Sequence, residues 1–120
     1  MLTKNKNNAE TDANVFIKIN GEVLQTVELA LTNSNYSDPF EKGQTDVFQF
    51  ESSDIGEVKN ITLRHDNTGS GASWIPENVV IVDTNENEAW KCTSDGGFMS
   101  STQGLTKVIT CSEGKRYWLV

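Results

Sequence analysis

The feature of this sequence that most constrains its fold is a series of three short runs in which apolar and polar residues alternate. The runs cover residues 46–50, 55–67 and 74–81, turn-forming residues separate them, and Trp74 opens the third. Alternation with a period of two is typical of β-strands that bury one face, and short strands joined by turns are typical of a β-sandwich. The pattern therefore predicts an all-β sandwich with Trp74 in its core, and it does not suggest an enzyme cleft.

Further alternating segments extend the β pattern along most of the chain. Strands are expected at residues 13–19, 23–31, 45–51, 58–65, 79–83, 88–92, 105–110 and 116–120. Asn20-Gly21 is a turn signal, and only residues 52–56 resemble a helical turn. The length of 120 residues fits one domain, which we assign to residues 9–120. Residues 1–8 are expected to form a flexible segment or the remnant of a first strand.

The balance of charges argues against a nucleic acid partner. The chain carries 10 basic and 17 acidic residues, and its Lys and Arg are scattered, whereas binding to a phosphate backbone needs clustered basic side chains. Acidity spread over Asn-rich loops fits either solvated surface charge or a domain that holds a hard cation. No hydrophobic run approaches the roughly 18 residues of a membrane-spanning helix, and residues 1–10 are too polar for a signal peptide.

Cys92 and Cys111 leave two interpretations open. Each lies in a strand-like segment, and the Gly-rich stretch between them could return the second strand alongside the first. A disulfide would close a loop of about 20 residues, contribute about 3 kcal/mol and indicate an extracellular or secreted protein. Two buried free thiols are the alternative. The residues suggest neither a cysteine metal cluster nor a catalytic cysteine, because the chain has no CxxC motif and only one histidine.

The residues give little support for catalysis. His65 and Asp66 are adjacent on an expected strand, so their side chains should point to opposite faces, and His65 is expected at the surface of a strand end. Residues 69–73 lack the lysine and the following helix of a phosphate loop, and they lack the spacing of a nucleophile elbow. We interpret them as a hairpin tip. We therefore expect no catalytic residues, and a protein that is not an enzyme.

Several spaced motifs resemble those of a known family. They are T-D-A-N-V-F from residue 11, F-E-K-G from residue 40, D-x-F-x-F from residue 46, I-G-x-V-x-N-I-T-L-x-H-D-N from residue 55 and W-x-P-E-N-V-V-I from residue 74. In this order they look like the PLAT domain, the β-sandwich of lipoxygenases, pancreatic-type lipases, clostridial α-toxin and polycystins. The resemblance covers about residues 9–92. It implies a non-catalytic module of two packed four-stranded antiparallel sheets.

The resemblance also implies calcium binding at loops on one end of the sandwich, which in several family members docks an enzyme onto a membrane or a protein partner. Glu10-Thr11-Asp12 stands where the family has a G-T-D loop. Asp12 would supply a carboxylate, Thr11 a carbonyl or hydroxyl oxygen, and Glu10 additional charge. Ser73 stands where the family often has an acid before the tryptophan, so it would offer a carbonyl at best.

A second loop completes the implied ligand set. Residues 38–43, Asp-Pro-Phe-Glu-Lys-Gly, match the N-D-F-E-R-G loop of lipoxygenases, so Asp38 and Glu41 inherit the ligand role. Three carboxylates, completed by carbonyls and water, would suffice for a modest calcium site. The alternative is that Asp12, Asp38 and Glu41 only cap turns and solvate loops.

Membrane contact has fewer candidate residues. Family members that insert into bilayers carry exposed aromatic residues at loop tips near the calcium, whereas the equivalent tip here consists of Gly and Ser. Tyr36, Phe98 and Met99 are the apolar candidates for membrane or partner contact, and ordinary loop packing is their alternative role. Trp74 and Trp90 are better explained as core residues.

Two classes of function remain in competition. One is a calcium-assisted module that docks onto membrane lipid or targets an associated enzyme, and the other is a calcium-independent sandwich for protein interaction or stress response. A monomer is the favoured oligomeric state. The family usually begins with a full strand before the G-T-D loop, and here only Leu2 and Thr3 remain. We hypothesise that the additional strand at residues 105–110 fills the vacant edge position.

Overall fold

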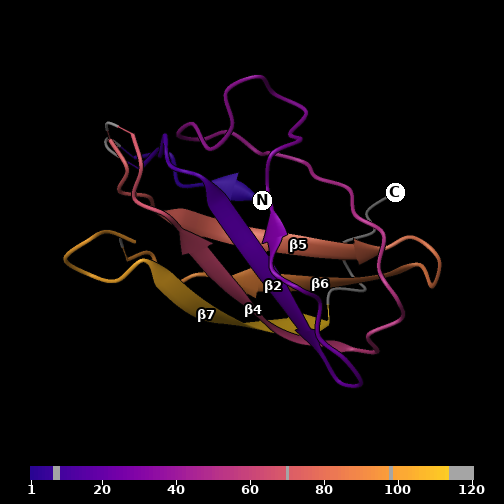
Figure 1. Ribbon diagram of the computed structural model, residues 1–120. Helices are drawn as coiled ribbons and strands as arrows, with labels where there is room; N and C mark the ends of the chain where they lie inside the picture. Colours follow the sequence, from indigo (N-terminus) through magenta and orange to yellow (C-terminus); the bar gives the residue numbers. More distant parts are fainter. Residues whose placement is uncertain (7–8, 70, 98, 114–120) are drawn as a thin grey trace.

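The computed structural model describes residues 1–6, 9–69, 71–97 and 99–113, and these residues form seven β-strands and no helix (Figure 1). The strands are β1 (Leu2–Thr3), β2 (Val15–Gly21), β3 (Leu29–Ala30), β4 (Val58–His65), β5 (Pro76–Asp83), β6 (Glu88–Thr93) and β7 (Thr106–Glu113). All neighbouring strands are antiparallel. This part of the chain has no helix that is long and apolar enough to cross a membrane. The expected strand at residues 116–120 lies outside the described residues.

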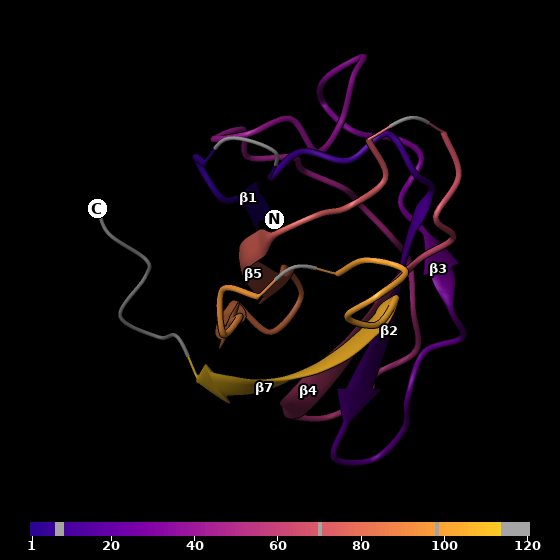
Figure 2. The same cartoon turned by 90° about the vertical axis from the view of Figure 1, so that its left-hand side faces the viewer.

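The strands form one curled sheet in the order β1-β5-β6-β7-β4-β2-β3. β7 joins its two halves, because residues 106–110 pair with β4 and residues 111–113 pair with β6. Figure 2 shows β7 as a long curved strand along one side of the molecule. A strand that changes partners in this way turns a corner between two packed layers. The all-β sandwich is confirmed, and the two expected sheets of four strands share β7 as halves of one sheet.

The position of β7 corrects one hypothesis. Residues 105–110 do not fill an edge, because β7 lies between β4 and β6 in the middle of the sheet and the edge strands are β1 and β3. The edge beside β5 belongs to the short β1, in which Leu2 pairs with Asn78 and Thr3 with Pro76. From this central position β7 contributes Ile109, which is 4% exposed, to the core.

The core lies between the two halves of the sheet. Alternate residues of β2 and β4 point into it, so Val15, Ile17, Ile61 and Leu63 are at most 3% exposed. Trp74 is fully buried, as the sequence predicts, and its ring meets the ring of Phe40 edge-on at a centroid distance of 5.3 Å. These alternating strands therefore follow the pattern that the sequence predicts.

Three expected elements between β2 and β4 differ from the prediction. Within residues 23–31 only Leu29–Ala30 pair as a strand, residues 45–51 form no strand, and residues 52–56 form no helical turn. The chain instead turns just after Gly21, where Val23 N donates to Ile55 O at 2.9 Å. A Cβ atom on Gly21 would lie 2.2 Å from Ile55 O. This turn therefore depends on glycine, whereas the expected strands would have needed partners that the sheet does not offer them.

The two cysteines form a disulfide, which decides between the two interpretations that the sequence leaves open. Cys92 and Cys111 are direct partners across β6 and β7, with Cα atoms 4.1 Å apart. Cys111 is also the first residue of β7 that pairs with β6. The disulfide therefore joins the two strands at the point where β7 passes from one half of the sheet to the other.

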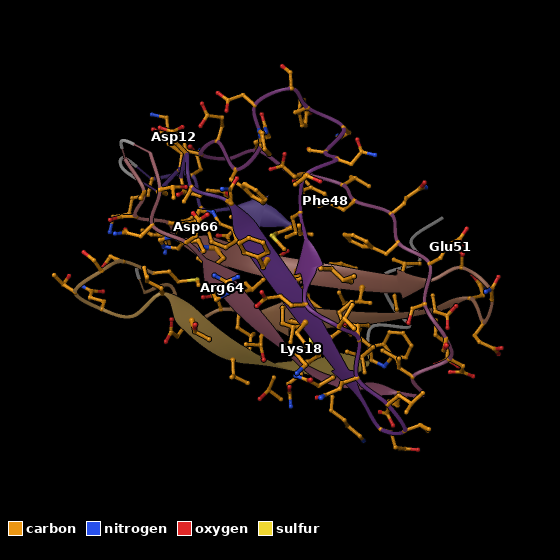
Figure 3. All side chains as sticks on the ribbon, viewed as in Figure 1. Asp12, Lys18, Phe48, Glu51, Arg64 and Asp66 are labelled. Carbon is orange, nitrogen blue, oxygen red and sulfur yellow. A yellow bond between two sulfur atoms is a disulfide. The ribbon has the colours of Figure 1, made fainter. Side chains whose placement is uncertain are left out.

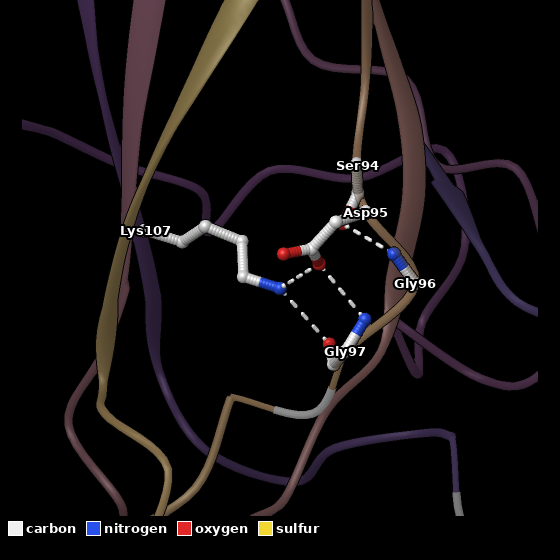
Figure 4. A network of polar contacts seen from close by, with 5 residues as sticks. All are labelled: Ser94, Asp95, Gly96, Gly97 and Lys107. Atoms are coloured by element: carbon white, nitrogen blue, oxygen red, sulfur yellow. Dashed lines mark hydrogen bonds and ion pairs between the residues drawn. The ribbon is translucent and has the colours of Figure 1, made fainter.

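The connection between β6 and β7 is fastened by a small polar network (Figure 4). Lys107 Nζ donates to Asp95 Oδ1 at 2.8 Å and to Gly97 O at 3.0 Å, and Gly97 N donates to the same carboxylate oxygen. The hydrogen bond from Lys107 is the main reason why the pKa of Asp95 lies below its usual value. The Gly-rich connection is thus tied to the start of β7.

Candidate metal site

Three loops meet at one end of the sandwich. The loop before β2 is joined to the loop after β3 by a hydrogen bond from Thr11 N to Phe40 O, 3.2 Å. Two further hydrogen bonds connect the loop before β2 to the loop after β4. Thr11 Oγ1 donates to Ala72 O at 2.5 Å, and Asp12 N donates to Gly71 O at 3.4 Å. Figure 3 shows Asp12 at this end of the molecule. The three loops therefore support one another around Asp12.

Three carboxylates gather where these loops meet. Asp12, Asp38 and Glu41 each present a carboxylate oxygen, and these oxygens lie within 4.8 Å of one another. Oxygens bound to one calcium ion lie about 2.3–2.6 Å from it, so they can be separated by up to about twice that distance. Asp12 and Asp38 are exposed and Glu41 is half-buried. The donor set therefore fits a hard cation in chemistry and spacing, and it brings together three of the six ligands expected from sequence.

Like charges and burial act on Glu41. Its pKa is raised by desolvation first, then by the charge of Asp38 and a hydrogen bond with it, and then by Glu10 and Asp12. The folded protein therefore binds a proton on Glu41 more readily than the unfolded chain does. By linkage, Glu41 therefore lowers the free energy of unfolding at high pH. The destabilisation sets in as the pH rises from the pKa of Glu41 in the unfolded chain to its higher pKa in the folded protein, and it is absent at lower pH.

Replacing Glu41 with glutamine is expected to raise the midpoint of thermal unfolding at pH 7 in the presence of chelator. The substitution removes a charge that is partly desolvated and faces two like charges, and the difference from the wild type should shrink as the pH falls below the ordinary carboxyl range, where Glu41 is protonated in both the folded and the unfolded protein. In calcium the order should reverse, because the variant has lost a charged ligand. A lower midpoint for Glu41→Gln in chelator at pH 7 would show that the three charges do not repel one another at this site.

The other expected ligands lie near the cluster with different contacts. Glu10 Oε2 accepts a hydrogen bond from Lys42 N at 3.2 Å. Thr11 is 1% exposed, and its hydroxyl is already engaged with Ala72 O and Ala13 N. Ser73 is half-buried beside Trp74. Glu10 is thus not among the three converging carboxylates, whereas the oxygen ligands expected from Thr11 and Ser73 stay predictions.

The residues expected to contact a membrane or partner differ in their exposure. Tyr36 lies in the loop that leads to Asp38 and is 49% exposed, so its ring is available to a surface. Phe98 lies outside the described residues. Met99 is fully buried, pairs with Trp74 through backbone hydrogen bonds and belongs to the hydrophobic core. The prediction of membrane or partner contact by Met99 is therefore wrong.

The expectation that His65 lies at the surface is also wrong. The side chain is fully buried, its Nε2 lies 2.7 Å from Met99 O, and its Nδ1 accepts a hydrogen bond from Asn67 N at 3.1 Å. Because a carbonyl can only accept, Nε2 carries the proton. His65 thus anchors the β6–β7 connection to the start of the loop after β4.

Sequence reasoning missed two acids that shape the loops. Asp66 accepts hydrogen bonds from the backbone and side chains of Thr68 and Asn14, which hold its pKa far below the usual value, with the Thr68 side chain as the largest cause. Asp46, expected as a strand residue, is fully buried and binds the loop that carries Asp38 and Glu41. Only the D-x-F-x-F motif marks Asp46 in the sequence, and nothing there separates its acid from an exposed strand residue.

A cleft of about 320 Å³ lies next to two of the acids. Asp12 and Asp38 belong to its lining, together with Val15 and Leu31 from the ends of the neighbouring strands. An ion at the acidic cluster would therefore have open space beside it.

The curled sheet with its loops gathered at one end defines a β-sandwich domain of the kind that lipoxygenases carry. The structure of coral 8R-lipoxygenase aligns with 92% of this chain and 16% of its own chain, with a TM-score of 0.79 and 22% identity. Another lipoxygenase structure aligns with 92% of this chain and 15% of its own, with a TM-score of 0.78 and 21% identity. At such identities the likeness establishes the fold.

The chain belongs to the PLAT/LH2 domain family, whose model matches residues 2–101. This confirms the resemblance drawn from the motifs. Lipoxygenase homology domain-containing protein 1 of Mus musculus is 46% identical over 90 residues, which is 73% of this chain, and its Homo sapiens counterpart is 43% identical over 75 residues, which is 62%. The chain spans only 4% of the length of either relative.

Proposed function

We propose that this PLAT/LH2 domain is a non-catalytic, calcium-assisted binding module that docks onto a membrane lipid surface or targets an associated enzyme. The observation that carries the proposal is the convergence of Asp12, Asp38 and Glu41 at the loop end of the sandwich. Coral 8R-lipoxygenase, which shares the fold, is activated by calcium through a C2-like domain. When bound, calcium would supply the positive charge that the cluster lacks and could accept further oxygen ligands from the partner.

Two observations bear on the nature of the partner. Tyr36 is the one predicted contact residue that the structure shows exposed, which is a small apolar anchor for a bilayer. The net charge of −7 also opposes approach to anionic lipid unless calcium bridges the two surfaces. These observations favour a weak, calcium-dependent membrane contact over a strong one. The alternative class is a calcium-independent sandwich for protein interaction or stress response.

The disulfide supports our proposal for the compartment. A bond between Cys92 and Cys111 persists in oxidising surroundings, which supports an extracellular or secreted protein. A monomeric domain is consistent with this proposal.

The central test is calorimetric titration of the protein with calcium, with chelator as the blank. The wild type should show heat and a rise in the thermal midpoint at millimolar calcium, whereas the double variant Asp12→Asn with Asp38→Asn should show neither, because only one carboxylate remains to hold the ion. Glu51→Gln is the matched control, since this exposed acid lies far from Asp12 (Figure 3). Equal binding by the double variant would place the ion elsewhere, and no binding by the wild type would refute calcium assistance.

The partner class can be separated by co-sedimentation with vesicles of phosphatidylserine and phosphatidylcholine, with and without chelator. Membrane docking predicts binding that requires calcium and is weakened by Tyr36→Ser. If calcium binds in solution but the protein stays in the supernatant at every calcium concentration, the lipid proposal fails and a protein partner is favoured.

A further inference from the structure

We propose that Asp46 is the positioning residue of the metal site, and that its buried carboxylate holds Asp38 and Glu41 within reach of one ion. This inference rests on the proposed function, because it concerns the affinity of the same site. Asp46 is not one of the three converging acids. It is fully buried beneath their loop, and it reaches the site through the residues that it binds.

The carboxylate of Asp46 receives three hydrogen bonds from the loop after β3. Its Oδ2 accepts from Phe40 N at 2.8 Å, and its Oδ1 accepts from Ser34 Oγ at 2.7 Å and from Gln44 Nε2 at 3.0 Å. Gln44 Nε2 also donates to Asp38 O at 2.9 Å. Asp46 thus holds three separate positions of this segment, and its partner Gln44 also contacts Asp38 directly.

The bond to Phe40 fixes an unusual backbone conformation. Phe40 has a φ of +65°, although it is neither glycine nor asparagine, and this left-handed region is unfavourable for a large side chain. Its ring compensates by packing, since it is 2% exposed and stacks on Phe48 at a centroid distance of 5.8 Å. Phe40 lies between Asp38 and Glu41, so its conformation determines how these two acids are aimed.

Such a brace is needed because the acids repel one another. Their carboxylate oxygens lie within 4.8 Å of one another, and a free loop would relieve the repulsion by moving the carboxylates apart. Asp46 reaches the site through its hydrogen bonds to Ser34, Phe40 and Gln44. Its effect on the site is therefore expected to be geometric, in the way that groups behind metal ligands orient them.

The variants Asp46→Asn and Asp46→Glu test this role by calorimetric titration at a temperature where circular dichroism shows each variant folded. Asparagine keeps the size but cannot accept from all three donors, and glutamate keeps the charge but misplaces it by a methylene. Both should weaken calcium binding by about tenfold or more, the usual cost of losing a group that orients a metal ligand. Val79→Ala is the control. It truncates a 3% exposed core residue on β5, so it should destabilise the fold and leave the calcium affinity unchanged.

A second readout needs no ion. In chelator, the NMR three-bond coupling between the amide and Cα protons of Phe40, which reports its φ, should change in both Asp46 variants and stay unchanged in Val79→Ala. If the wild type binds no calcium, the proposed function fails, and the Phe40 coupling still decides whether Asp46 fixes the loop. If the wild type binds calcium and both Asp46 variants match it in affinity, or if Val79→Ala loses as much affinity as they do, Asp46 is only a structural residue and the inference is overturned.

Discussion

Replacing Trp74 with alanine is expected to lower the free energy of unfolding by about 3–5 kcal/mol, the range measured for buried large aromatic residues. Trp74 is fully buried, its ring packs against Phe40, and its Nε1 donates a 2.9 Å hydrogen bond to Thr3 Oγ1. The substitution would therefore leave a cavity and an unpaired hydroxyl at the junction of the core, β1 and the metal loop. Small domains have about 5–15 kcal/mol in total, so much of the stability would be lost.

Urea unfolding followed by circular dichroism measures this loss, and Trp74→Phe keeps the experiment interpretable if the alanine variant does not fold. Phenylalanine retains the aromatic contact with Phe40 but loses the hydrogen bond to Thr3, so its cost should be smaller than that of alanine. Loss of Trp74 should also weaken calcium binding, because Phe40 would lose a neighbour that holds it in place. A decrease below about 1 kcal/mol for Trp74→Ala would show that the core does not depend on this ring.

The sequence correctly predicts the strands in which every second residue is buried in the core. Residues of β2 and β4 follow the alternation closely, because each strand has neighbours on both sides and one face against the core. Residues 23–31 show the same pattern and yet are mostly irregular, with Val23 and Val27 at 68% and 76% exposed. Alternation reports a tendency to pair, but it cannot report that no neighbouring strand is available.

The sequence predicts residues of the candidate site only where a motif marks them. The two loop motifs lead to Asp12, Asp38 and Glu41, which the structure brings together. Asp46 and Asp66 could not be predicted as loop anchors, because their roles depend on hydrogen bonds to residues that are distant or irregular in conformation. The burial of His65 and Met99 has the same origin, since each depends on how the β6–β7 connection folds back over β4 and Trp74.

The disulfide is a structural brace that is independent of the metal site. Within the part of the chain that the structure describes, three residue pairs join β6 to β7, and Cys92 with Cys111 is the pair at the corner of the sheet. The bond links two residues that are 19 positions apart in the sequence and closes the loop between them. Because it limits the unfolded chain and secures a short seam, its removal should act on stability much more than on calcium affinity.

Replacing both cysteines with alanine is expected to lower the free energy of unfolding by about 3 kcal/mol, as the chain-entropy model gives for a loop of this size. Urea unfolding of the oxidised wild type, the wild type in reductant and the double variant provides the comparison. Reductant should bring the wild type close to the double variant and leave the double variant unchanged, whereas the calcium affinity of the folded protein should stay the same in all three. If the thiol-free protein matches the oxidised wild type in stability, the seam between β6 and β7 is held by its backbone pairing and packing alone.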